Sequence, residues 1–281
     1  MYDGADMYKK IRLIASRFLY DIYDWFQMIM NKGSRQESVY FYTFHKCAST
    51  LFGGYVLKNI DDLHQVDYSY HIYIGKKPRI RFEKFGHVYG PLRLSALQLP
   101  SIPLETHLIE TVSNPEFISD KIAVFLIRDP RDILVSSYYS YGFTHSISDV
   151  PETREVQIKV RKIVQEMTVD EFALASVESM LRNFEKIDEL NNACVKSVVI
   201  RYEDMINDFD NFITGFTKYL SLSQSVIQTI YERSRPRQSI DNASHRRSGK
   251  AGMFRHELKM ETVDILNAKL STILAKFNYS A

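Results

Sequence analysis

Short apolar runs alternate with amphipathic stretches along most of this chain. The runs have the length and the aromatic or β-branched content of buried strands, and they cover residues 39–44, 103–108, 121–127 and 197–201. Elsewhere apolar residues recur every three or four positions, which predicts helices at 51–60, 133–141, 169–190, 209–220, 225–233 and 261–277. Strands that alternate with helices are typical of an α/β domain with a mainly parallel sheet flanked by helices.

The pattern contains no linker between two domains, so we expect a single domain at residues 34–281. Residues 1–33 contain an amphipathic helix at 8–31, which we expect to pack on that domain. Its basic residues also suit a helix on a membrane surface, which is the less favoured interpretation. Residues 61–99 are interrupted by glycine and proline and predict no regular elements, which suits loops that face a substrate.

Composition bounds the class of protein and its compartment. The 281 residues are 45% hydrophobic and 25% charged, so we expect a full core with a solvated surface. A formal net charge of +2 gives no reason to expect nucleic acid as a partner. Two cysteines, Cys47 and Cys194, form no disulfide framework, and no apolar run resembles a transmembrane segment or a secretory signal. We therefore expect a cytoplasmic protein.

Polar side chains follow each of the four predicted strands. In chain order they are Lys46, Ser49 and Thr50, then His107, then Arg128 and Ser136, and finally Tyr202. Because the carboxyl ends of parallel strands meet at one edge of a sheet, we expect these side chains to converge. The tight loop at Lys46, followed by a helix, also offers free backbone N–H groups to an anion. This loop lacks the two glycines of GxxxxGK[ST], so it predicts a shorter, P-loop-like site for phosphate or sulfate.

Together these stretches resemble the sulfotransferase family, whose members use 3′-phosphoadenosine 5′-phosphosulfate (PAPS) and release adenosine 3′,5′-bisphosphate (PAP). The family loop PKSGTTW is similar to HKCASTL at residues 45–51, and the family's arginine with a serine eight residues later is similar to RDPRDILVS at 128–136. The loop RKGxxGxW resembles RSGKAGMF at 247–254, KTHLP resembles ETHLI at 105–109, and Tyr-Glu-Asp is present at 202–204. The matches follow the family order.

The resemblance implies a PAPS-binding sulfotransferase fold and a role for each matched residue. Lys46, Cys47, Ala48, Ser49 and Thr50 would hold the 5′-phosphosulfate, Arg128 and Ser136 the 3′-phosphate, Tyr202 the adenine, and Arg247, Ser248 and Gly249 a loop that closes over the nucleotide. Lys46, Ser136 and His107 would be the catalytic residues, with His107 as the base that takes the proton of the acceptor. The implied reaction moves the sulfuryl group, in line, to a hydroxyl or amine of a small-molecule or natural-product acceptor.

The sequence departs from the family at positions that concern the adenine and the base. Leu51 stands where the family often has a tryptophan that stacks on adenine, so another side chain must cover that face. Glu83, Glu105 and Glu110 are rivals to His107 as the base, because some carbohydrate-modifying branches that resemble this family use a glutamate. The sequence therefore defines the cofactor side of the site better than the acceptor side.

Two other functions are weighed against a sulfotransferase: a phosphotransferase that uses ATP, and a non-catalytic nucleotide-binding module. The lack of a GK[ST] loop and of a clear Mg²⁺ carboxylate opposes the first, and an intact Lys46 and His107 oppose the second. The chain has no HxxxH, CxxC or clustered carboxylates with ligand spacing, so we expect no metal. Cys47 suits either a reactive thiol or a small loop residue, and we favour the loop residue.

Overall fold

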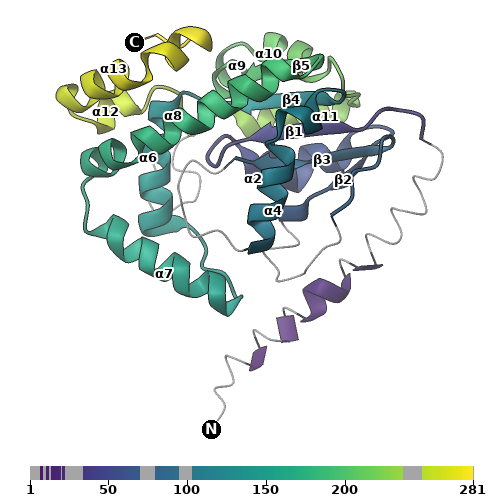
Figure 1. Cartoon of the computed structure of the whole chain (residues 1–281), viewed down its shortest axis with the longest axis horizontal. Helices are drawn as coiled ribbons and strands as arrows, with labels where there is room; N and C mark the ends of the chain where they lie inside the picture. Colours follow the sequence, from purple (N-terminus) through teal and green to yellow (C-terminus); the bar gives the residue numbers. More distant parts are fainter. Residues whose placement is uncertain are drawn as a thin grey trace.

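A parallel sheet with its first strand in the middle organises this protein. The structure is a computed structural model that describes residues 7–8, 11–12, 14–19, 21–22, 34–69, 80–94, 103–236 and 249–280. In these residues β1 (Val39–Thr43), β2 (His64–Val66), β3 (His87–Arg93), β4 (Ile122–Ile127) and β5 (Lys196–Arg201) pair in parallel in the order β2-β3-β1-β4-β5 (Figure 1). The predicted parallel α/β sheet is confirmed.

Helices cover both faces of the sheet. They are α2 (Ser49–Leu51), η1 (Phe52–Val56), η2 (Leu57–Asn59), α4 (Pro103–Val112), α5 (Pro115–Ile118), α6 (Pro130–Tyr139), η3 (Ser140–Thr144), α7 (Pro151–Gln165), α8 (Val169–Ala193), α9 (Tyr202–Asn207), α10 (Phe209–Phe216), α11 (Gln224–Ser234), α12 (Phe254–Glu257) and α13 (Met260–Lys276). Phe41 of β1 stacks on Phe52 of η1 at 5.1 Å, whereas Tyr40 on the opposite face meets Phe117 of α5 at 5.4 Å between ring centroids. This alternation buries β1 completely, as a central parallel strand requires.

Local signals set the starts of the helices that follow the strands. The Asp129 side chain accepts a hydrogen bond from the Arg131 N–H, and Pro130 occupies the first position of α6. Thr168 and Glu171 form the predicted capping box at the start of α8. Helix α8 then packs against α6 and α13, which lie beside it in Figure 1.

The predicted strand at residues 103–108 is wrong, because this stretch belongs to the helix α4. Pro103 suits the first turn of a helix, and Leu108 and Val112 are buried four residues apart, which is a helical spacing. The short apolar run was ambiguous, since periodicity alone does not separate a short strand from a buried helix face. His107 is therefore not at the end of a strand.

β1 has β4 on one side and β3 on the other. β3 thus takes the place expected for a strand at 103–108, and it lies in the region for which the sequence predicted no elements. The β1–β3 pairing shifts register between Tyr40 and Tyr42, so Gly90 and Pro91 form a bulge opposite one residue of β1. Gly90 has a φ of 152°, and a Cβ built there would lie 2.7 Å from the Phe41 carbonyl oxygen. A glycine and a proline inside a strand are thus explained by the bulge, although in the sequence they indicate a turn.

The described part of the N-terminal segment lies away from the sheet and its helices (Figure 1). Its large apolar side chains between Met7 and Ile22 are between 48% and 68% exposed. Arg12 lies 3.5 Å from the carboxylate of Asp149, just before α7. The expected packing of residues 1–33 on the domain stays a prediction. None of the described helices is both long and apolar enough to cross a membrane.

Candidate active site

The loop between β1 and α2 turns sharply at two residues that are not glycine. Lys46 has a φ of 70° and Ala48 a φ of 55°, both in the left-handed region. The first hydrogen bonds of the following helix run from the N–H groups of Leu51 and Phe52 to the Ala48 carbonyl oxygen, at 2.8 and 3.1 Å. The N–H groups ahead of Leu51 have no acceptor inside the helix, so they are available to an anion.

Replacing Ala48 by glycine is expected to raise the free energy of unfolding by about 0.5–1 kcal/mol, because glycine adopts the left-handed conformation without the cost that a Cβ brings. Urea denaturation measures the change. Ala123→Gly, in the buried strand β4, is the matched control and should be destabilising. A loss of stability at both positions would show that the Ala48 conformation carries no strain.

Lys46 points to the turn that follows α6. Its Nζ donates a hydrogen bond to the Ser140 Oγ at 2.9 Å. Burial, followed by the positive charge of Arg128, lowers the pKa of the Lys46 amine to about 8. Ser140 was not among the predicted site residues, although it lies four residues after the predicted Ser136 and therefore one helical turn away. The amine is held in a desolvated place, where its charge has a strong effect on a nearby anion.

Arg128 joins the loop after β1 to the loop before α12. Its Nη1 donates to the Lys46 carbonyl oxygen at 3.1 Å, and its Nη2 donates to the Lys250 carbonyl oxygen at 3.0 Å and to the Asp132 carboxylate at 3.3 Å. The guanidinium also lies 4.4 Å from the centre of the Tyr202 ring. One donor of this buried side chain, the Nε, has no hydrogen-bond partner. An orphaned, buried cationic donor suits an incoming anion oxygen.

The described part of the predicted closing loop, residues 249–254, contacts the same residues. The Tyr202 hydroxyl donates to the Gly249 carbonyl oxygen at 2.8 Å. The Asp132 carboxylate accepts hydrogen bonds from the N–H groups of Gly252 at 2.8 Å and Phe254 at 3.0 Å. The structure thus brings Gly249 and Tyr202 together with Arg128. Arg247 and Ser248, predicted for the same loop, lie outside the described residues.

The remaining predicted residues of the loop after β1 differ in how they are placed. Cys47 is fully buried, and burial raises the pKa of its thiol to about 12, so it is a packed residue and not a nucleophile. Ser49 is buried at the start of α2, and Thr50 beside it is exposed. Ser136 is half-buried on α6. These hydroxyls lie on the two helices that follow β1 and β4, whose carboxyl ends are neighbours in the sheet.

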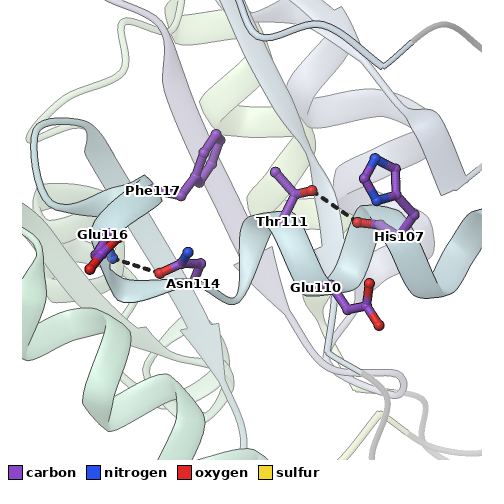
Figure 2. A pocket seen from close by; sticks show the side chains of 6 residues that line it. All are labelled: His107, Glu110, Thr111, Asn114, Glu116 and Phe117. Carbon is purple, nitrogen blue, oxygen red and sulfur yellow. Dashed lines mark hydrogen bonds between the residues drawn. The ribbon is translucent and has the colours of Figure 1, made fainter.

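His107 lies elsewhere, exposed on α4. It lines an open depression of about 570 Å³ together with Glu110, Thr111, Asn114, Glu116 and Phe117, shown in Figure 2. The polar contacts drawn there are local: the Thr111 hydroxyl donates to the His107 carbonyl oxygen, and the Asn114 side chain caps α5. None of the residues that gather around Lys46 and Arg128 lines this depression. Within the described chain, no contact joins His107 to them.

Sequence reasoning missed Arg93, the last residue of β3. It pairs in register with Thr43 of β1, and the next residue, Leu94, donates its N–H to the Thr43 carbonyl oxygen at 3.1 Å. Arg93 is half-buried at the carboxyl edge of the sheet, where ligands bind in open α/β folds. The sequence did not predict a strand that ends at Arg93, because β3 contains Gly90 and Pro91, which in a sequence indicate a turn.

A family model matches this chain, and solved structures are similar to it. The model of the sulfotransferase domain matches residues 24–269. The crystal structure of mouse sulfotransferase SULT7A1 complexed with PAP is 14% identical over 86% of this chain and 84% of its own, with a TM-score of 0.51. Retinol dehydratase in complex with androsterone and inactive cofactor PAP is 14% identical over 84% of this chain and 80% of its own, with a TM-score of 0.46. No curated protein matches the sequence.

The family match covers most of the chain, and the likeness to SULT7A1 shows that the fold is shared. The chain belongs to the sulfotransferase family. Its class is therefore that of enzymes that transfer a sulfuryl group, and the loop after β1 and the end of β4 are the parts of the fold that carry the predicted nucleotide contacts.

Proposed function

We propose that this enzyme transfers the sulfuryl group of PAPS, in line, to a hydroxyl or amine of a small-molecule acceptor. The observation that carries the proposal is the buried Arg128 guanidinium, which touches the Lys46 loop, Tyr202 and the Lys250 backbone and keeps one donor without a partner. A nucleotide with two separated phosphates fits this place, because two cationic side chains, Lys46 and Arg128, follow neighbouring strands.

The proposed contacts follow the matched positions. Lys46, Ser49 and Thr50, with the backbone of Cys47 and Ala48, hold the 5′-phosphosulfate; Arg128 and Ser136 hold the 3′-phosphate; Tyr202 faces the adenine; and Arg247, Ser248 and Gly249 belong to the loop that closes over the nucleotide. The Lys46 amine donates a hydrogen bond to the Ser140 hydroxyl oxygen, so Ser140 orients the amine. We add Arg93, half-buried at the carboxyl end of β3, as a further cation for the anionic cofactor.

Catalysis by these residues is mainly positioning and charge stabilisation. The sulfuryl group spreads negative charge over its oxygens during transfer, as a phosphoryl group does. Lys46 neutralises the charge that develops on the oxygen between sulfur and phosphorus when that bond breaks. The N–H groups ahead of Leu51 stabilise the phosphate that is left. PAPS supplies the activated sulfuryl group, and no metal ion is needed for these roles; no cluster of metal-ligand type occurs in the part of the chain that the structure describes.

PAP is expected to bind at least about tenfold more tightly than AMP, because each charge-assisted contact to the 3′-phosphate contributes about 1.5–3 kcal/mol. Isothermal titration calorimetry with PAP, AMP and ATP measures the order of affinities. Equal affinities for PAP and AMP would contradict the assignment of Arg128. Tighter binding of ATP than of PAP would favour a phosphotransferase instead.

We also propose that the enzyme acts in the cytoplasm. Cys47 and Cys194 are both buried, free thiols, which suits a reducing compartment. Fractionation of the expressing cells, with the chain detected by an antibody, tests this location. The partner that we expect is the small-molecule acceptor, and the modest net charge of +2 gives no reason to expect nucleic acid.

A further inference from the structure

An acceptor hydroxyl must lose its proton when it attacks sulfur, so a sulfotransferase needs a base near the Lys46 loop. The sequence assigned this role to His107 because ETHLI resembles the family's KTHLP segment and because a strand was expected to end there. In the structure that stretch is the helix α4, and His107 is exposed on it. The base must instead be sought among the groups at the carboxyl edge of β1 and its neighbours.

The carboxylates that follow β4 are already paired. Asp132 accepts hydrogen bonds from the N–H groups of Gly252 and Phe254, besides its ion pair with Arg128. Asp129 lies 2.7 Å from the buried guanidinium of Arg131. A carboxylate that is held by a cation and by backbone donors is a weak proton acceptor, because these contacts stabilise its charged form.

The carboxylates that follow β5 have structural partners as well. Glu203 accepts hydrogen bonds from the Asp129 N–H at 3.0 Å and from the Tyr279 hydroxyl at 3.1 Å. It therefore connects the segment after β5 to the segment after β4 and to Tyr279. Asp204 forms an ion pair with Arg201 at 2.6 Å. Both side chains therefore hold the scaffold of the site together.

None of the other acidic candidates directly follows β1, β4 or β5. Asp67 follows β2, which β3 separates from β1, so it is about 10 Å away across the sheet. Glu83 precedes β3 and thus belongs to the opposite edge. Glu105 and Glu110 are on α4 with His107. A base must come within about 3 Å of the proton that it takes.

His45 remains. It lies in the loop between the buried Phe44 and Lys46, and its side chain is half-buried. The centre of its ring is 6.5 Å from that of Tyr141, in an edge-to-face arrangement. Tyr141 directly follows Ser140, which holds the Lys46 amine, so the imidazole lies on the side of the loop to which Lys46 points.

We propose that His45 is the general base that takes the proton of the acceptor. The proposal rests on the proposed sulfuryl transfer. The acceptor oxygen forms a bond to sulfur while its proton passes to an imidazole nitrogen of His45. The bond between sulfur and the 5′-phosphate oxygen breaks, and its electron pair stays on the phosphate of PAP. His45 then releases the proton to solvent, so the products are the sulfated acceptor, PAP and one proton.

Several titratable or charged groups lie around His45. Lys46 is its neighbour in the loop, and the Tyr141 ring faces it from η3. His145 lies beyond, with its ring 6.0 Å from that of Tyr141. The guanidinium of Arg161 donates to the carbonyl oxygens of Tyr141 and His145.

The test compares His45→Gln with His107→Gln and His145→Gln in the full chain. Transfer of labelled sulfate from PAPS is measured to 2-naphthol, whose hydroxyl stays protonated near neutral pH, and to water. His45→Gln is expected to lower kcat by about 10²–10⁴-fold while PAP affinity stays within about threefold of the wild-type value. The wild-type kcat/KM should rise with pH between about 5 and 8, the range in which imidazoles titrate, and this rise should vanish in His45→Gln. The two control variants should keep both the rate and the rise.

Rescue supplies a check that does not depend on the glutamine variant alone. Free imidazole should restore part of the rate of His45→Ala and leave His107→Ala unchanged. A rate and a pH profile that survive in His45→Gln, or that are lost only in His107→Gln or His145→Gln, would overturn the proposal for His45. PAP affinity is measured separately. Wild-type enzyme that does not bind PAP more tightly than AMP, or that transfers no sulfate to either acceptor, would contradict the proposed function and with it the role of His45.

Discussion

Replacing Lys46 by methionine is expected to lower kcat by about 10²–10³-fold, while the affinity for PAP falls by less than about tenfold. The reason is that the charge of Lys46 is needed most when the oxygen between sulfur and phosphorus becomes anionic. Its place is set by the hydrogen bond to Ser140 and by the turn at a φ of 70°. Single-turnover kinetics with labelled PAPS measure the chemical step, and calorimetry measures PAP binding.

Lys58→Met is the matched control, since Lys58 is exposed on η2 in the same connection between β1 and β2. It should change neither quantity by more than about twofold. The pH dependence of binding gives a second check on the same amine. Because its pKa is lowered to about 8 without ligand, PAP binding above this pH must take up a proton, and the affinity should fall with rising pH in wild type but not in Lys46→Met. A variant that loses PAP affinity and keeps kcat would show that Lys46 only anchors the nucleotide.

Arg128→Lys is expected to weaken PAP binding by about 10–100-fold and to leave AMP binding within about threefold. Lysine keeps the charge, but it lacks the planar fork that contacts Asp132, the backbone of Lys46 and the Tyr202 ring at once. The orphaned Nε is lost as well, and with it the donor that we assign to the 3′-phosphate. Calorimetry with both nucleotides measures the difference directly.

The control for Arg128→Lys is Arg255→Lys, because Arg255 is exposed on α12 and is not part of the contacts around Arg128. Its affinities for PAP and AMP should not change. Thermal denaturation without ligand shows whether the domain is intact, since Arg128 is part of a buried ion pair with Asp132. If PAP and AMP weaken by the same factor in Arg128→Lys, the guanidinium supports the loop and does not read the 3′-phosphate.

The central strands and their helix caps could be predicted from the sequence because their signals are local. β1, β4 and β5 are short apolar runs, and the residues after β4 and before α8 cap their own helices through Asp129, Pro130 and the Thr168–Glu171 pair. The parallel order then places Lys46, Arg128 and Tyr202 at one edge, since all three follow strands of the same direction. That convergence needs only alternation of strands and helices.

Only the tertiary structure decided which residues complete this edge. β3 contains Gly90 and Pro91. They fit a strand only because β3 pairs with the neighbouring β1 on both sides of a bulge at these two residues. The run around His107 is apolar enough for a strand, but it forms a helix, so His107 does not follow a strand as Lys46 and Arg128 do. Ser140 lies four residues after Ser136, and His45 directly precedes Lys46. Their contacts, Ser140 with Lys46 and His45 with Tyr141, nevertheless join segments about a hundred residues apart. Local propensity determines elements, whereas such contacts depend on how the whole chain is packed.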